Sequence, residues 1–182
     1  MNTQIEEKVK TFSIMNDISL KGEIVVFGSS YTANFPFYEL SSRYVMSNAL
    51  YNRSIDSLSL KDACDVVTPC VIDLKPAKVF LSFGENDFDS PTAIADYEKL
   101  IRKINSALPH CSVFVLSVRG GRNNGFNDAL VSLCRKVGAK YVTLDFGDGE
   151  DAQQYRKIYK ELSCFFRTKA ITFDEAFALS RC

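Results

Sequence analysis

The sequence has only one histidine, His110, among its 182 residues, and it lacks the patterns that mark several classes of protein. No two of its six cysteines have the Cys-x-x-Cys spacing, and most lie far from the histidine in sequence, which argues against a zinc site. Basic residues form no block, and lysine plus arginine equals aspartate plus glutamate at 22 each. We therefore expect no metal, no other cofactor and no nucleic-acid partner.

Long apolar segments are absent as well. No run is long enough to span a bilayer, and the first residues, MNTQIEEKVKTF, lack the apolar core of a signal peptide. Cys64, Cys111 and Cys134 lie within apolar patterns, which favours buried free thiols. These features predict a protein of the reducing cytoplasm with no membrane partner.

Linkers rich in proline or glycine and internal repeats are also missing, so we expect residues 1–182 to form a single domain. With 46% hydrophobic residues, a chain of this length can build a substantial core. Five short apolar segments hardly alternate with polar residues, which is typical of strands buried on both faces. The predicted strands are Glu23–Phe27, Val45–Tyr51, Lys78–Phe83, Ser112–Val118 and Lys140–Asp145.

Amphipathic segments lie between and around these strands. Apolar residues recur every three or four positions after Pro91 and again from Phe126 to Val137, where Gly138 ends the pattern. Further helices are expected at Ile5–Met15, around residues 155–162 and in a short segment at 173–180. The alternation of strands and helices predicts a three-layer α/β/α domain with a five-stranded parallel sheet.

Two short motifs follow predicted strands at their carboxyl ends, where ligands bind in open α/β sheets. Gly28–Ser30 reads GSS and enters a helix, so its serines are candidates for a helix cap, a phosphate site or a nucleophile. Gly84–Asp87 reads GEND, and the Asn86 amide could donate to an oxygen that becomes negative during acyl transfer. Asp87 could hold the turn, and the whole motif could equally be an Asx-rich turn.

Together, the segments GSS, NRSIDS and GEND resemble the SGNH, or GDSL-type, hydrolase family in order and spacing. The similarity is closest to the subgroup with GSS in the first block and GEND in the third, and it extends from about Ile5 to Asp145. The resemblance implies a flavodoxin-like sheet and a serine hydrolase of small acyl esters, with acetylated carbohydrates among the candidates. A small-molecule ester or a carbohydrate-like ligand is the partner it implies, and it leaves the oligomeric state open.

The resemblance also assigns roles to residues of this chain. The nucleophile falls on Ser30, Ser29 takes the place of the usual aspartate, and Asn86 is the oxyanion-hole amide. The second-block glycine, whose N–H is another oxyanion donor, falls on Asp56. That is a departure from the family, because a carboxylate pointing inward there would oppose the developing negative charge.

The family's last block, Asp-x-x-His, has no counterpart here. Thr168 and Ile171 fall on its two positions, and no histidine follows His110. His110 precedes the fourth predicted strand, so we expect it at the opposite edge of the sheet, about 20 Å away along a six-residue strand. Proton transfer needs about 3 Å. The other candidate bases are Lys169, Asp56, Asp145 and Asp148.

The sequence therefore leaves more than one function open. The first is an ester hydrolase with a degraded catalytic triad, in which a residue other than histidine would take the serine proton. The alternative is a non-catalytic descendant of the family that binds a small ligand or a protein partner. A third, weaker hypothesis is a phosphate-binding α/β protein that uses the helix after Gly28.

Overall fold

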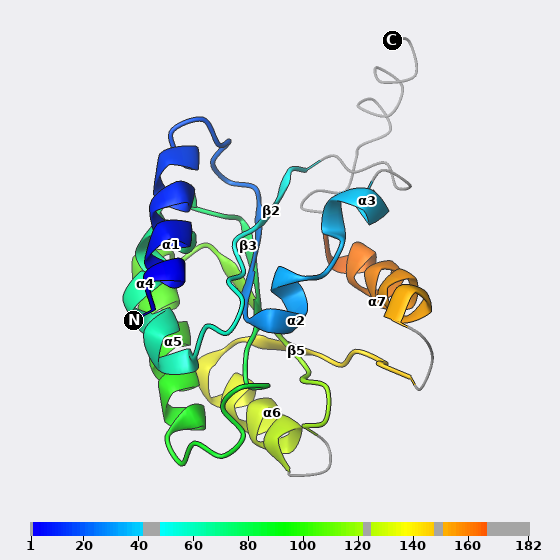
Figure 1. Ribbon diagram of the computed structural model, residues 1–182. Coiled ribbons are helices and arrows are strands. Elements are labelled where there is room, and N and C mark those ends of the chain that lie inside the picture. The colour runs from blue at the N-terminus through cyan, green and yellow to red at the C-terminus, as the bar shows by residue number, and fades with distance from the viewer. Residues whose placement is uncertain (1, 42–47, 122–124, 148–150, 167–182) are drawn as a thin grey trace.

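A computed structural model describes residues 2–41, 48–121, 125–147 and 151–166 of the chain. Its centre is a parallel five-stranded sheet with the strand order β2-β1-β3-β4-β5 (Figure 1). This is the flavodoxin-like order, so the predicted fold class is confirmed. The strands are β1 Ile24–Gly28, β2 Leu50–Asn52, β3 Lys78–Ser82, β4 Ser112–Leu116 and β5 Lys140–Val142.

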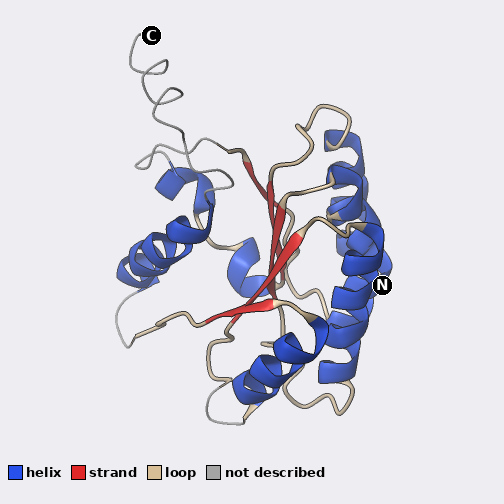
Figure 2. Cartoon of the chain, turned by 180° about the vertical axis from the view of Figure 1, so that it is seen from behind, coloured by secondary structure: helices blue, strands red, loops and turns tan. Residues whose placement is uncertain are grey.

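Helices cover both faces of the sheet, as Figures 1 and 2 show from opposite sides. On one face, the apolar side chains of a larger helix layer and of the strands form one core cluster. On the other face, a smaller helix layer and the strands form a second cluster. The larger layer holds α1 Thr3–Met15, α4 Leu60–Cys70, α5 Ala93–Ala107 and α6 Phe126–Val137. The smaller layer holds α3 Phe37–Ser41 and α7 Asp151–Phe166, while α2 Ser30–Ala33 and a 3-10 turn at Ile72–Leu74 connect elements.

The central strand β1 shows why these segments do not alternate between apolar and polar residues. Val25 and Phe27 belong to the core cluster under α1, α4, α5 and α6, whereas Ile24 and Val26 belong to the cluster under α3 and α7. All four side chains are buried. Because both faces of a parallel sheet are covered, both sets of positions must be apolar.

All five predicted strands are present, but several end earlier than expected because polar side chains replace the strand ladder. Beyond β4, the Asn127 side chain accepts the N–H of Val118 at 2.9 Å and donates to its carbonyl at 3.0 Å. Beyond β5, the hydroxyl of Ser117 accepts the N–H of Leu144 at 2.8 Å. Residues 45–47 of the second predicted strand and the predicted helix at 173–180 lie outside the described residues.

Helix α4 was not predicted, although the sequence carries a signal for it. The Ser59 hydroxyl accepts the N–H of Asp62 at 3.1 Å, which caps the first turn. Leu60, Cys64 and Val67 are buried at helical spacing. Pro69, which lies inside the last turn, weakens the helical pattern because proline donates no backbone hydrogen bond.

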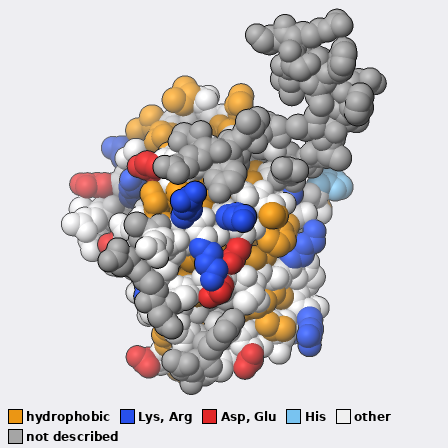
Figure 3. Space-filling view, turned by 90° about the vertical axis from the view of Figure 1, so that its right-hand side faces the viewer, with side chains coloured by type: hydrophobic (Ala, Val, Ile, Leu, Met, Phe, Trp, Pro, Cys, Tyr) orange, Lys and Arg blue, Asp and Glu red, His pale blue; other side chains and the backbone are white. Residues whose placement is uncertain are grey.

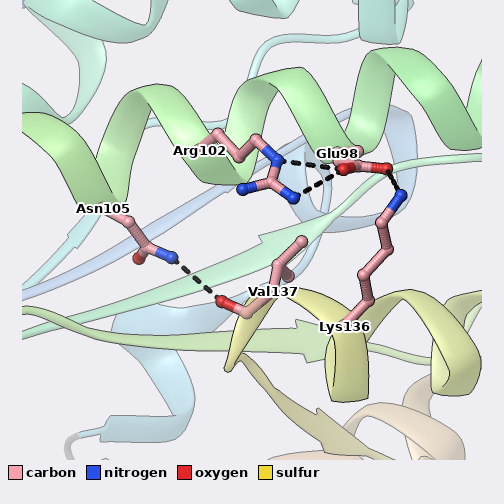
Figure 4. Close-up of polar contacts among 5 residues, drawn as sticks. All are labelled: Glu98, Arg102, Asn105, Lys136 and Val137. Carbon is pink, nitrogen blue, oxygen red and sulfur yellow. Dashed lines mark hydrogen bonds and ion pairs between the residues drawn. The ribbon is translucent and has the colours of Figure 1, made fainter.

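Polar side chains tie α5 to α6 on the outside of the larger layer (Figure 4). The Glu98 carboxylate accepts hydrogen bonds from Arg102 on its own helix and from Lys136 on α6, the latter at 2.8 Å. Asn105 donates its amide to the Val137 carbonyl at 3.2 Å. The hydrogen bonds from Lys136 and then Arg102 lower the pKa of Glu98, so this carboxylate stays ionised in the folded protein.

The surface carries both signs of charge. Figure 3 looks onto the side of α3 and α7, where basic and acidic side chains lie among one another. Among the described segments, no helix combines the length and the apolar character needed to cross a membrane. Cys64 and Cys134 are buried free thiols as predicted, whereas Cys111 is half-buried because it lies in the turn before β4.

Candidate active site

The turn from β1 into α2 places two serines at the carboxyl edge of the sheet. Gly28 is required at its start, because a Cβ atom there would lie 2.2 Å from the Thr32 hydroxyl and 2.5 Å from the Ser82 carbonyl oxygen. The close approach lets the Ser29 N–H donate to the Ser82 carbonyl at 3.0 Å. Ser29 is consequently fully buried, and Ser30, which begins α2, is half-buried.

The two motifs predicted to meet at this edge do meet. Nδ2 of Asn86 donates a hydrogen bond to Oγ of Ser29 at 2.7 Å. Ser29 stands at the N-cap position of α2, yet its hydroxyl does not cap the helix. An amide nitrogen carries two N–H groups, so the second one on Asn86 is not used by this bond and can serve a ligand.

The loop after β2 also reaches the nucleophile candidate, through Ser57. The Ser57 N–H donates to Oγ of Ser30 at 3.0 Å. Ser57 has φ = 58°, in the left-handed region that favours glycine. The resemblance assigns the N–H donor to Asp56, but the N–H that donates to the Ser30 hydroxyl belongs to the next residue, Ser57. Spacing alone did not reveal it, because the choice depends on one backbone torsion.

The Asp56 side chain is exposed to solvent, and it is one of the residues that line the groove described below. Water and salt screen exposed charges strongly, so the opposition that a carboxylate would present to a developing oxyanion is weak here.

Glu85 is the site residue that sequence reasoning missed. Its Oε1 accepts the N–H of Tyr31, the residue that follows Ser30, at 2.7 Å. The carboxylate is half-buried in a narrow cleft that is also lined by Phe83 and Phe146. Burial raises the pKa of Glu85 above its ordinary value of 4.5, although the Tyr31 N–H bond opposes the change. The available signal was its place in GEND, immediately after a strand that neighbours β1.

The other residues of GEND hold the loop in place. Gly84 has φ = 124°, and a Cβ atom there would lie 2.3 Å from the Phe126 ring. Asp87 is buried, and its Oδ1 accepts the N–H of Leu60 at the start of α4 at 3.2 Å. Asp87 therefore does accept a backbone N–H, but it joins the loop to another helix instead of closing its own turn. Burial raises the pKa of this carboxyl as well.

Among the described residues, no hydrogen bond joins a candidate base to the Ser30 hydroxyl, which accepts the Ser57 N–H. His110 is exposed in the turn before β4, whose first residue pairs with the first residue of β3 at the amino edge of the sheet. Asp145 is exposed and forms an ion pair with Lys157 of α7. Asp148, Thr168, Lys169 and Ile171 lie outside the described residues.

A polar groove of about 650 Å³ opens beside Ser30, between the first turns of α1 and the loop after β2. Asn34, Tyr38, Asn52 and Ser57 are among the residues that line it. Asn34 donates its amide to the Ser30 carbonyl at 2.9 Å, and Ser57 contacts the Ser30 hydroxyl. Two lining residues therefore contact Ser30, which does not itself line the groove, and the charged side chains of Lys8, Asp56 and Asp62 line it beside the amides and hydroxyls.

Comparison with solved structures agrees with this architecture. A Streptococcus pneumonia protein provisionally named a platelet activating factor has a TM-score of 0.78 at 18% identity, over 90% of this chain and 93% of that one. A GDSL-like lipase from Bacteroides thetaiotaomicron has a TM-score of 0.71 at 12% identity, over 87% and 96%. A mutant acetyl-xylooligosaccharide esterase from Geobacillus Stearmophilus has a TM-score of 0.62 at 9% identity, over 82% and 96%.

By sequence, neither a family model nor a curated protein matches the chain. The structural likeness spans most of the chain and most of each neighbour, so it shows the fold. The protein is an α/β domain with the fold of the SGNH, or GDSL-type, hydrolases, as the sequence motifs predicted.

Proposed function

We propose that this chain is a serine ester hydrolase of the SGNH type whose catalytic triad is degraded. The observation that carries the proposal is the position of Ser30, whose Oγ accepts the Ser57 N–H at 3.0 Å, while the Asn86 amide donates to the adjacent Ser29. Acyl transfer requires a hydroxyl nucleophile with N–H donors nearby for the carbonyl oxygen that becomes negative, and the Ser57 N–H and the second N–H of Asn86 are candidates for that role.

In the proposed reaction, Oγ of Ser30 attacks the ester carbonyl carbon and the carbonyl π electrons move to its oxygen. The N–H groups of Ser30 and Ser57 and the Asn86 amide hold this oxyanion, which needs donors about 2.7–3.1 Å away. The tetrahedral intermediate collapses, the C–O bond to the alcohol breaks, and the alcohol leaves with a proton. Water then attacks the acyl-enzyme, releases the acid and restores the Ser30 hydroxyl.

The proposed reaction also needs a group that accepts the hydroxyl proton of Ser30. The only histidine of the sequence, His110, is exposed at the other edge of the sheet. Loss of the triad base lowers turnover by about 10⁶ in a serine hydrolase, with roughly 10³–10⁴ over water remaining from the oxyanion hole and binding. We therefore expect slow, Ser30-dependent hydrolysis instead of efficient turnover.

For the substrate, we propose a small acyl ester of a polar alcohol, with acetylated carbohydrates as the leading candidates. Supporting this, the groove beside Ser30 presents the side chains of Asn34, Tyr38 and Asn52. Amides and hydroxyls hydrogen-bond to the hydroxyl groups of a sugar. One structural neighbour is described as an acetyl-xylooligosaccharide esterase.

The second candidate function is a non-catalytic protein that binds a small ligand or a protein partner at the same site. The observation that favours it is again the position of His110, because a serine without a base is a poor nucleophile. In that case Ser30, Ser57 and Asn86 would bind a ligand oxygen without bond cleavage.

Hydrolysis of p-nitrophenyl acetate separates the two functions. Purified wild-type protein is compared with Ser30→Ala and with Ser106→Ala, which removes an exposed hydroxyl on α5. The hydrolase predicts release of p-nitrophenol that Ser30→Ala abolishes and Ser106→Ala leaves unchanged. Equal rates for all three proteins would reject the hydrolase and leave the binding function.

A further inference from the structure

Glu85 contacts the turn that carries Ser30, at the residue that follows the proposed nucleophile. Its carboxylate accepts the Tyr31 N–H at 2.7 Å, and the adjacent Ser30 N–H lowers the pKa of this carboxyl by a smaller amount. The Ser30 N–H is one of the groups proposed to hold the oxyanion. A negative charge supplied by the protein therefore faces the same edge of the turn as the negative charge of the transition state.

We propose that Glu85 masks the N–H groups of the Ser30 turn, so that the ionised carboxylate lowers the reactivity of Ser30 toward acyl and phosphonyl groups. The inference rests on the proposed function, because it takes Ser30 as the nucleophile and its N–H as an oxyanion donor. Glu85 acts in this account as a positioning residue, since it works through backbone N–H groups and touches no reacting atom.

The contacts favour a mask over a catalytic base. A base must accept the hydroxyl proton of the nucleophile at about 3 Å or through one water. The hydrogen bond of Glu85 goes instead to the backbone of Tyr31, while the bond that Ser30 Oγ accepts comes from the backbone of Ser57. A carboxylate placed on these amides competes with an oxyanion for them, and like charges at short range repel.

The surroundings of Glu85 make this mask sensitive to pH. Burial, followed by the charges of Asp56 and Asp87, raises the pKa of Glu85 above 4.5, whereas the bonds from Tyr31 and Ser30 lower it. Arg119, which carries the opposite charge, lines the same cleft. As pH falls through this raised pKa, the carboxylate becomes neutral and the repulsion is lost.

The test measures how fast a fluorophosphonate attaches to Ser30, by intact-protein mass spectrometry. Glu85→Gln keeps an oxygen that can accept the Tyr31 N–H but removes the charge. At about pH 8, where glutamates are ionised, we expect Glu85→Gln to label about tenfold faster than wild type or more. Asp89→Asn, an exposed charge in the same loop, should label at the wild-type rate, and Ser30→Ala should not label.

The ratio of the Glu85→Gln rate to the wild-type rate should approach one as pH falls through the Glu85 pKa. If Glu85 had only a structural role, the ratio of the Glu85→Gln rate to the wild-type rate would be the same at every pH. Slower labelling of Glu85→Gln would make Glu85 the base and overturn the mask. Equal labelling, or no labelling of Ser30 in Glu85→Gln, would overturn it as well.

These outcomes are separate from those of the hydrolase test. If wild-type protein does not hydrolyse p-nitrophenyl acetate but Glu85→Gln labels rapidly at Ser30, the hydrolase proposal fails and the mask stands. If Glu85→Gln folds poorly, the amide resonance of Tyr31 in wild-type protein supplies a second measurement. It should shift as Glu85 titrates at acidic pH, and an unchanged resonance would overturn the contact itself.

Discussion

At the scale of single residues, the site depends on the backbone N–H of Ser57, whose placement is set by an unusual torsion. Ser57 adopts φ = 58° and directs its N–H to Ser30 at 3.0 Å. The left-handed region costs a residue with a Cβ atom about 1–2 kcal/mol relative to the right-handed one. The chain accepts this cost at a position where the N–H contacts the proposed nucleophile.

The torsion of Ser57 leads to a direct prediction. Ser57→Gly relieves the strain and keeps the N–H, so we expect the free energy of unfolding to change by less than about 1 kcal/mol and Ser30 labelling to persist. Ser57→Val places a β-branched side chain at a positive φ and should cost about 1–3 kcal/mol. Urea unfolding measures both. Equal losses for the two variants would show that the torsion is not what limits this position.

At the scale of elements, the loop from β3 to α5 is held by packing as well as by hydrogen bonds. Gly84 has φ = 124°, and its backbone lies close to the ring of Phe126, the first residue of α6. Asp87 of the same loop accepts the N–H of Leu60 at the start of α4. Glu85 and Asn86 are therefore positioned by contacts with two helices that are distant in sequence.

Gly84→Ala tests whether this loop is held as described. The new methyl group would meet the Phe126 ring at a disallowed φ, so we expect a loss of more than about 2 kcal/mol in the free energy of unfolding. Gly138→Ala is the matched control, because Gly138 has φ = 74° but no atom within 4 Å of its Cβ position. It should lose only about 1–2 kcal/mol. Equal losses in thermal unfolding would mean that the Phe126 contact does not hold the loop.

The sequence predicted elements better than it predicted their ends and their side-chain directions. The five strands were detectable because burial on both faces leaves continuous apolar runs. Helix α4 was missed because Pro69 lies in its last turn. The strand ends were missed because Asn127 and Ser117 take over the backbone hydrogen bonds, a contact that no local pattern records.

At the scale of the whole molecule, topology decides which distant residues share a site. A parallel sheet brings the carboxyl ends of all its strands to one edge, which is why the meeting of GSS with GEND could be predicted from the sequence. The partner differs, because Asn86 was expected beside Ser30 and donates instead to Ser29. The same rule placed His110 at the opposite edge. It did not distinguish Ser57 from Asp56, nor did it find Glu85, because each depends on a torsion or on a side-chain direction.

The central claim is that Ser30, at the carboxyl edge of the sheet, is the nucleophile of this fold. Peptide mass spectrometry after prolonged fluorophosphonate treatment tests it most directly, with Ser29→Ala and Ser30→Ala as comparisons. The account predicts an adduct on Ser30 that persists in Ser29→Ala and is lost in Ser30→Ala. An adduct on Ser29 or at another site, or no adduct in any of the three proteins, would contradict it.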